Sequence, residues 1–557
     1  MRTRSVCLFV ALAALSAVLP ATLAREGNLP DGWSIIVHGA TLHGANGLYF
    51  DAYDRLHIAS ALGSDITVVD PKTGTILDQF GMAEGITGPD DLFIREDGSI
   101  YVTSIYTGHI IRRFPDGSTR QQFVARGVNP VTMSSDGRLF TALDFLGDGL
   151  YEVDPELVAL PRRIVAGNLG YLNGMDWGRD GRLYGPLSAG QRVVSIDIDS
   201  CNDTMNPWAD CDIRTVADGF SVPVAVKFDS RGRLHVVDSD GSVYRVDTAS
   251  GTKVVLATLP EGLDNLAFDS KDRLFVSNFR HGWVVEVMPG GTYRELLRGG
   301  VIVPGGIAVL PGDGAAAVGP LEEQLVVADV WGLRRYDGRT GRSLGYASLG
   351  FTAGSPFTVS TRGNQLILSS WFDNSVRLFD LHSQQTIWKD TFAVPLDATV
   401  FGDDIAVSEL MTHRVVRASD HASIAEGLYV PAGLAARDGK LWVVDWASGV
   451  LWQIAEAGAS LSPPRIVTYG LSFPEGLAVE SDGNLLVVEI GARRVVRVNP
   501  ATGARAVLVD NLELGMPAVP GLAPTCYFNG VAVGPSGTIY VTGDAGTQVY
   551  RYKPSGD

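Results

Sequence analysis

The sequence has few cysteines and none of the short motifs that mark several common enzyme classes. Only four of its 557 residues are Cys, and no two of them form a C-x-x-C pair. It also contains no G-x-S-x-G, no H-E-x-x-H and no G-x-x-x-x-G-K-[ST]. A serine-triad hydrolase of the usual kind, a metalloprotease of the two-histidine helix type and a P-loop nucleotide hydrolase are therefore unsupported.

Positive charge and long apolar runs are scarce too. The net charge is -17, which disfavours nucleic acid and anionic membranes as partners. One apolar run, residues 7–19, follows Arg2 and Arg4 and ends in small residues at 21–24. This pattern predicts a signal peptide over residues 1–24 and a secreted or periplasmic protein. A membrane anchor is the alternative, but the run is short for a spanning helix, and no later segment is long enough to cross a bilayer.

Two of the cysteines are close together in the sequence. Cys201 and Cys211 flank the polar stretch CNDTMNPWADC. In an oxidising compartment this spacing predicts a disulfide between them. Cys7 would leave with the signal peptide, and Cys526 remains without an assigned partner.

Glycine is abundant, at 65 residues, and it is spread over a repeating unit of about forty residues, a period typical of propeller blades. Each unit has an apolar first strand, a Gly/Asp turn, a strand rich in β-branched residues and a third strand. Residues 46–51 (NGLYFD), 97–104 (DGSIYVTS) and 243–247 (VYRVD) are examples. With a looser fourth strand, these units predict an all-β protein of four-stranded antiparallel blades.

About twelve units fit two rings within the usual range of four to eight blades. We therefore expect two tandem six-bladed β-propellers, at residues 25–290 and 291–557. Each would be closed by an N-terminal outer strand. The segment at Trp33 would complete the blade that ends near Met288, and the segment at Thr292 would complete the blade that ends near Tyr552. One seven-bladed ring with a smaller domain is the alternative.

The first strands of a propeller line its central channel, so the residues that open them should converge at one mouth. In the first half, five of the six openers are Asn or Asp. Convergent oxygen ligands are what a hard cation needs, so the mouth is a predicted Ca²⁺ site, with Zn²⁺ or Mg²⁺ as alternatives. Asn and Asp also cap turns by bonding the local backbone, which is the competing interpretation. The predicted metal ligands are Asn46, Asp90, Asn129, Asn173 and Asp264.

Other polar residues are expected at the same mouth. Asp238 and Asn278 end second strands, and Asp144 occupies a comparable place. His281 lies in a second-to-third hairpin, where it could relay a proton near Asp264 or be an ordinary surface histidine. We predict Asp264 or Asp238 as the general base, and Asp144, Asn278 and His281 as substrate-binding residues.

The first-strand motifs resemble those of the gluconolactonase/senescence-marker-protein family and, more loosely, NHL-repeat propellers. Asp90-Asp91 in GPDDL resembles the family's Asn-Asp pair, which adds Asp91 as a substrate-binding candidate. Asn173 in LNGMDW and Asp264 in LDNLAFD resemble its Asn and Asp ligands, whereas Asn46 stands where the family has Glu. The resemblance implies a six-bladed propeller that holds one divalent cation and hydrolyses lactones.

Together these features predict a secreted, metal-dependent hydrolase of a small lactone or ester, with its site at the mouth of the first propeller. The alternative is a non-catalytic secreted propeller that binds a protein, peptide or glycan. In the second half, Gly305 and Ala432 at opener positions offer no side-chain ligands. A propeller lyase is a third hypothesis, and it would also need a metal.

Overall fold

The computed structural model describes residues 29–554 except 145, 166, 202–210, 313–322, 350–353, 519–522 and 526. The predicted signal peptide, residues 1–24, lies outside these residues. The described chain is all-β, and its only helical segments are two 3-10 turns, η2 (Met82–Glu84) and η3 (Ile198–Ser200). None of the described helices is long and apolar enough to cross a membrane.

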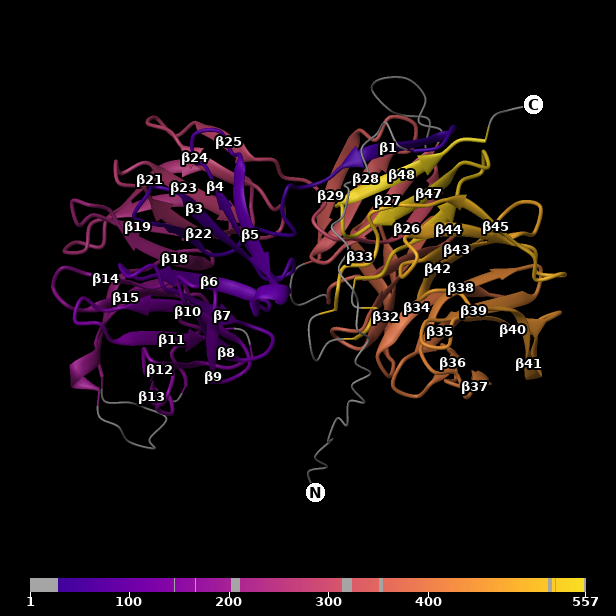
Figure 1. Ribbon diagram of the computed structural model, residues 1–557, viewed down its shortest axis with the longest axis horizontal. Coiled ribbons are helices and arrows are strands. Elements are labelled where there is room, and N and C mark those ends of the chain that lie inside the picture. Colours follow the sequence, from indigo (N-terminus) through magenta and orange to yellow (C-terminus); the bar gives the residue numbers. More distant parts are fainter. Residues whose placement is uncertain are drawn as a thin grey trace. The chain divides into compact units, whose positions relative to one another are not determined.

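The strands form twelve four-stranded sheets, divided between two compact units. The first unit comprises His38–Val303 with Asp329–Trp331. The second unit comprises the described parts of Met1–Val37, Pro304–Ala328 and Gly332–Asp557. Figure 1 shows that consecutive strands lie side by side within each sheet.

In the first unit, each sheet runs from a first strand outward through three antiparallel neighbours. Every first strand contacts the first strands of the two adjacent sheets, and the last contacts the earliest, so that the cycle closes. This cyclic arrangement is that of a β-propeller. These first strands are β2 (Leu48–Phe50), β6 (Pro89–Ile94), β10 (Val128–Met133), β14 (Asp176–Trp177), β18 (Pro223–Phe228) and β22 (Leu263–Phe268).

The second unit repeats this organisation. Its six first strands also contact one another in a closed cycle. They are β26 (Pro304–Pro311), β30 (Thr358–Arg362), β34 (Pro395–Phe401), β38 (Pro431–Arg437), β42 (Pro474–Val479) and β46 (Val531–Val533).

The core is divided into clusters between neighbouring sheets. Phe140 and Leu150 of one sheet, for example, pack with Leu183 and Val194 of the next, and all four are almost fully buried. The second strands are buried along their whole length because each sheet is covered on both sides by its neighbours. Apolar side chains on the sheet faces therefore supply the packing energy.

The predicted strand closures are wrong. β1 (Trp33–His38) pairs with β48 (Gln548–Tyr552) in the second unit, whereas β25 (Tyr293–Leu297) pairs with β24 (Val284–Val287) in the first. β25 follows β24 through a tight turn closed by the Met288 N–H to Thr292 C=O hydrogen bond of 2.8 Å. A short local hairpin forms more readily than a connection to a distant sheet. The predicted boundary at residue 290 falls inside this turn, and the units divide after Val303.

Side-chain packing explains where β1 belongs. The Trp33 ring lies 5.2 Å from that of Tyr552. Trp33 and Ile35 are buried in a cluster with residues of the last two sheets, including Val488 and Val541. The alternate residues of β1 therefore fill the outer edge of the sheet at the C-terminal end of the chain.

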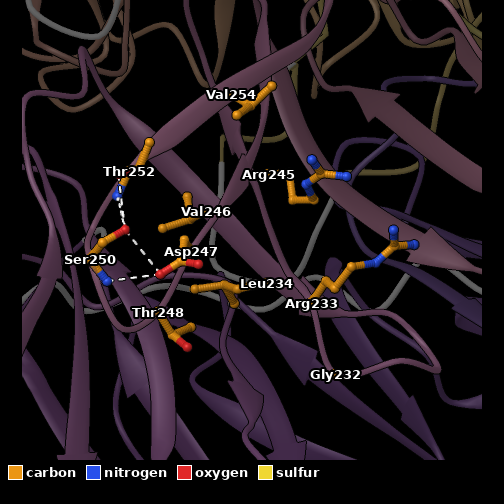
Figure 2. A pocket seen from close by; sticks show the side chains of 10 residues that line it. All are labelled: Gly232, Arg233, Leu234, Arg245, Val246, Asp247, Thr248, Ser250, Thr252 and Val254. Atoms are coloured by element: carbon orange, nitrogen blue, oxygen red, sulfur yellow. Dashed lines mark hydrogen bonds between the residues drawn. The ribbon is translucent and has the colours of Figure 1, made fainter.

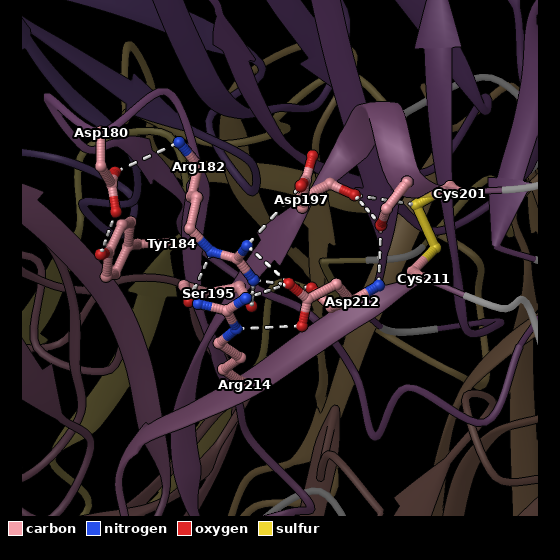
Figure 3. Close-up of polar contacts among 10 residues, drawn as sticks. Asp180, Arg182, Tyr184, Ser195, Asp197, Cys201, Cys211, Asp212 and Arg214 are labelled. Carbon is pink, nitrogen blue, oxygen red and sulfur yellow. Dashed lines mark hydrogen bonds and ion pairs between the residues drawn. A yellow bond between two sulfur atoms is a disulfide. The ribbon is translucent and has the colours of Figure 1, made fainter.

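The predicted disulfide is present: Cys201 and Cys211 are bonded in the connection between β16 (Arg192–Asp197) and β17 (Asp212–Ala217) (Figure 3). Next to it, Arg182 Nη1 donates to Asp212 Oδ2 at 3.0 Å. Arg214 Nε donates to the other oxygen of the same carboxylate at 3.0 Å. The disulfide and this ion-pair network together fix the start of β17.

We expect Cys201→Ser to lower the free energy of unfolding of the first unit by about 2–3 kcal/mol, because a short loop is no longer closed in the unfolded chain. Differential scanning calorimetry measures this as a lower first-unit transition temperature. Reduced wild-type protein should match the variant. An unchanged transition in both would show that the bond does not stabilise the unit.

Candidate functional site

The openings of the first strands in the first unit depend on glycines that let neighbouring backbones approach. A Cβ at Gly47 would lie 2.7 Å from Asp91 Cα, and one at Gly174 would lie 2.5 Å from Ala225 Cβ. The Gly47 N–H accordingly donates to the Asp90 carbonyl oxygen at 2.7 Å. This explains why Asn46 and Asn173 are each followed by Gly: the Asn-Gly pair opens a strand packed against the next one.

Five of the predicted residues are linked by hydrogen bonds or by their mutual charges. We call them the mouth cluster: Asn46, Asp90, Asn129, Asp144 and Asp264. Asn46 Nδ2 donates to Asp90 Oδ1 at 3.3 Å, and Asn129 Nδ2 donates to Asp144 Oδ2 at 2.9 Å. Asn46 also forms a hydrogen bond with Asp264. The structure thus brings together residues from the sheets that begin at β2, β6, β10 and β22.

The three carboxyl groups of the mouth cluster are electrostatically unfavourable as anions. Burial and the charge of Asp144 raise the pKa of Asp264 to about 8. Burial raises the pKa of Asp90 and that of Asp144 well above the ordinary range, and Asp264 and Asp90, respectively, add repulsion. No described Lys or Arg forms an ion pair with any of the three. The cluster therefore favours bound protons or a bound cation.

One oxygen of the cluster has no partner. Asp144 Oδ1 is buried and forms no hydrogen bond with any described group. A buried acceptor without a donor is costly, so it marks a place where a proton, water or cation would be stabilised.

Asn173, the remaining predicted ligand, and Asp91, a predicted substrate-binding residue, have local partners. Asn173 Oδ1 accepts from the Gly174 N–H at 2.7 Å, as in the turn-capping interpretation. Asp91 accepts from the Val131 N–H at 3.0 Å and from Asn265 Nδ2 at 3.1 Å. It therefore connects the sheets that begin at β6, β10 and β22.

Carboxylates at the ends of second strands accept hydrogen bonds from the backbone of neighbouring loops. Asp238 accepts from the backbone N–H groups of Ser221 and Val222, both at 2.7 Å. In the second unit, Asp445 accepts in the same way from Tyr429 and Val430. Asp238 ends its second strand, as predicted, but both of its oxygens accept from the loop before the first strand.

Asn278 and His281 form a local turn. Asn278 Oδ1 accepts from the His281 N–H at 2.8 Å, and Asn278 Nδ2 donates to the Glu261 carbonyl at 2.8 Å. His281 lines a cavity of about 340 Å³ with Pro260 and Trp283, and no residue of the mouth cluster lines that cavity.

Sequence reasoning missed two residues beside Asp91. Asn265 binds its carboxylate, and the positive charge of Lys227 opposes the rise that burial causes in the pKa of Asp91. The sequence signal for both was their place within first strands, where alternate residues face the channel.

Within the described ranges, no group of three or more His, Cys, Asp or Glu side chains is arranged to hold a metal ion. Any ion at the mouth cluster would therefore be bound by fewer than three carboxylates, together with amide or water oxygens. This donor set is all oxygen, which fits a hard cation such as Ca²⁺ better than a softer metal. The unpartnered Asp144 Oδ1 agrees with that fit.

The second unit has a buried acidic group in the corresponding region. Glu475 Oε2 accepts from both the backbone N–H and Nδ2 of Asn529, at 2.7 and 2.9 Å. Burial and the charge of Asp544 raise the pKa of Glu475 to about 8. Asp544 in turn accepts from the Gly515 and Met516 N–H groups, so these residues form internal contacts rather than an open ligand set.

No family model matches the chain, and no curated protein matches it. Among solved structures, it is similar to a virginiamycin B lyase from Staphylococcus aureus, at 11% identity and a TM-score of 0.37, over 61% of this chain and 96% of that one. It is also similar to a gluconolactonase from Xanthomonas campestris, at 17% identity and a TM-score of 0.34, over 46% and 89%.

A third similar structure is the extracellular domain of a hybrid two-component system from B. thetaiotaomicron. It has 11% identity and a TM-score of 0.34, over 93% of this chain and 82% of that one. Likenesses this distant carry no argument about activity.

Proposed function

We propose that the first unit is a six-bladed β-propeller that binds one divalent cation at its mouth cluster and hydrolyses a small lactone or ester. The observation that carries this proposal is the burial of Asp90, Asp144 and Asp264 together, without a described cationic partner and with one unpartnered oxygen. Such a group is stabilised by a cation, and propeller mouths are where ligands enter.

We further propose that the second unit is a second six-bladed propeller, sealed by β1, and that the protein is secreted or periplasmic. The closed cycle of first strands and the pairing of β1 with β48 support the fold. The Cys201–Cys211 disulfide supports an oxidising compartment.

The residues best placed to hold the cation are Asp90 and Asp264, with the amide oxygen of Asn129; Asn46 Oδ1 already accepts from the Ala61 N–H at 3.1 Å. When bound, the cation would supply a Lewis acid for the carbonyl oxygen of an ester. Asn129 holds Asp144 in place through its 2.9 Å hydrogen bond. Asn173 Oδ1 already accepts a hydrogen bond from the Gly174 N–H, which holds this oxygen against its own backbone rather than toward the cation.

Asp264 is the proposed general base. The pKa of about 8 applies to the cation-free protein; a bound cation would lower it and keep the carboxylate ionised, so that it can accept a proton from an attacking water. Asp238 is a poorer candidate because both of its oxygens accept from backbone N–H groups.

A non-catalytic binding propeller is the second candidate function. It is favoured by the limited acidic ligand set, since no three described acidic or His/Cys side chains are arranged around one point. A protein that binds Ca²⁺ yet hydrolyses none of the tested esters would support it.

The direct test is hydrolysis of γ- and δ-lactones and of aryl acetates by the mature protein, treated with chelator and then reloaded separately with Ca²⁺, Zn²⁺ or Mg²⁺. The hydrolase proposal expects turnover that is lost with chelator and restored by one ion. Turnover that is identical with and without chelator would exclude the proposed metal role.

Cation affinity should rise with pH. Because the pKa of Asp264 is about 8, binding below that pH displaces a proton, and the affinity for Ca²⁺ should increase on the order of tenfold per pH unit between pH 6 and 8. Calorimetric titration in buffers of different ionisation enthalpy measures both the affinity and the released proton. A pH-independent affinity would show that cation binding does not displace a proton from Asp264.

A further inference from the structure

Five sheets of the first unit carry an Arg immediately before the second strand: Arg55, Arg138, Arg182, Arg233 and Arg273. In two of these sheets, the third strand supplies a Glu and the fourth strand a second Arg. The Glu is paired in register with the fourth-strand Arg, as Glu152 with Arg162 and as Glu286 with Arg294. In these two sheets the order across the sheet is therefore Arg, Glu, Arg; the other four have Val68, Arg112, Ser195 and Arg245 at the place of the Glu.

The Glu lies between the two guanidinium groups. Arg138 Nε donates to Glu152 Oε1 at 2.7 Å, and Arg162 Nη2 donates to Glu152 Oε2 at 2.6 Å. In the other sheet, Arg294 Nη2 donates to Glu286 Oε2 at 2.7 Å, and Arg273 Nη1 lies 3.9 Å from Glu286 Oε1. In both cases one carboxylate neutralises charge from both sides.

The sheet that begins at β18 differs from these two at both the third and the fourth strand. Its third-strand position is Arg245 and its fourth-strand position is Val254, as the register shows. Arg233, like Arg273, forms an ion pair with the Asp four residues before it. Arg233 Nε donates to Asp229 Oδ2 at 2.6 Å. The side chain of Arg245 forms no hydrogen bond or ion pair with any described residue. The substitution therefore replaces a shared anion by an uncompensated cation in a protein of net charge -17.

A cavity of about 480 Å³ opens at this place (Figure 2). Arg233 and Arg245 lie on one side of it, and Leu234 and Val246 form part of its apolar lining. Val254 also lines the cavity, and it is much shorter than the Arg that stands there in the other two sheets. Arg245 thus brings a positive charge to the cavity, and Val254 contributes only a short side chain to its wall.

The opposite side of the cavity is polar but already carries a negative charge. Asp247 Oδ1 accepts from the Ser250 N–H at 2.8 Å and from Ser250 Oγ at 3.0 Å. Thr248 and Thr252 line the same side (Figure 2). A second negative group there would be repelled, whereas ligand hydroxyls can form hydrogen bonds with these side chains.

We infer that this cavity, the β18 pocket, binds a hydroxylated small molecule bearing one oxyanion, with Arg245 and Arg233 as the oxyanion receptor. The ligand's carboxylate, sulfate or phosphate takes the place that Glu152 and Glu286 have in their own sheets. Guanidinium groups bind such oxyanions with paired N–H donors. None of the pocket's residues belongs to the mouth cluster, so the inference does not depend on the proposed hydrolase activity.

The test uses the mature full-length protein at constant ionic strength, with three probes: glucuronate, glucose 6-phosphate and inorganic sulfate. Glucose and chloride are the uncharged and simple-anion controls. Binding is measured by equilibrium dialysis and by the first-unit transition in calorimetry. We expect saturable binding of at least one oxyanion, accompanied by a saturable rise of that transition. Preference among the three probes identifies the carboxylate or the tetrahedral oxyanion as the ligand group.

Two substitutions remove the receptor and one is a matched control. Arg245→Glu introduces the residue that stands at this place in two of the other sheets, Glu152 and Glu286. It should weaken binding by about tenfold or more and, without ligand, raise the first-unit transition by pairing with Arg233. Arg245→Gln should weaken binding similarly without this gain, and it serves if the Glu variant fails to fold. Arg163→Glu makes the same change of charge on the exposed face of another sheet and should leave binding unchanged.

The inference is overturned if no probe binds saturably to the wild-type protein, or if binding survives both Arg245 substitutions. It is also overturned if Arg163→Glu weakens binding as much as Arg245→Glu, because net charge would then explain the effect.

Discussion

Deletion of Trp33–Val37 should unfold the second unit under conditions where the first unit stays folded. The deleted strand buries Trp33, Ile35 and Val37, whose exposed fractions are 8, 7 and 5%. Burial of three large side chains contributes roughly 5–9 kcal/mol, which is comparable with the whole stability of a typical domain. The deletion also leaves the edge of β48 unpaired, which exposes it to aggregation.

Calorimetry combined with limited proteolysis tests this deletion. The Cys201→Ser variant identifies the first-unit transition, since the disulfide lies within that unit. We expect the other transition to disappear and the protease-resistant fragment to begin near residue 38 and end near residue 303. Trp33→Ala is the milder variant and should cost about 3–5 kcal/mol. Loss of the first-unit transition instead would support closure of the first ring by Trp33.

Asp264→Asn should abolish cation-dependent stabilisation and reduce ester hydrolysis by about 10²–10⁴-fold, the usual contribution of a positioned acid or base. Asn keeps the size of the side chain but cannot carry the negative charge or accept a proton from water. Wild-type protein at a Ca²⁺ concentration of 100 times Kd should gain about 2.7 kcal/mol of stability, and the variant should gain almost none.

The same variant should have the opposite effect on the cation-free protein. The pKa of Asp264 is higher in the folded protein than in the unfolded chain, where the ordinary value is 3.8. The folded state then binds the extra proton, so stability is greatest below pH 4 for this group and is lost as pH rises toward 8. Cation-free wild type should therefore lose stability between pH 5 and pH 8.5, and Asp264→Asn should lose less.

Asp238→Asn is the matched control for Asp264→Asn. It removes one carboxylate from the same unit, but this carboxylate accepts from Ser221 and Val222 and lies outside the mouth cluster. We expect lower stability with cation binding retained. If Asp238→Asn abolished cation binding and Asp264→Asn did not, the proposed assignment of the ligands would be wrong.

The sequence predicted much of the secondary structure because strand and turn preferences are local. The forty-residue repeat of short apolar strands and Gly/Asp turns located the repeated strands, and the Cys201–Cys211 spacing located the disulfide. The openers Asp90 and Asp264 were also identified, since their position follows from where each first strand begins. Their raised pKa values could not be foreseen, because they arise from burial and from charges on other sheets.

Sequence position alone also failed to separate Asp144 from Asp238. Both follow or end a second strand, yet one has an unpartnered oxygen in the mouth cluster and the other is fully engaged by backbone N–H groups. The length and course of the preceding loop decide whether its N–H groups reach the carboxylate, and short-range patterns do not encode that course.

By itself, then, the sequence determined the all-β architecture, the repeated unit and the polar residues that open the first strands, since these follow from periodicity and turn chemistry along the chain. The tertiary structure decided which sheet receives β1, which carboxylates share a charge cluster and where Arg245 remains without an acidic partner. Those outcomes depend on contacts between residues far apart in sequence, where packing and electrostatics, not local preference, select the partner.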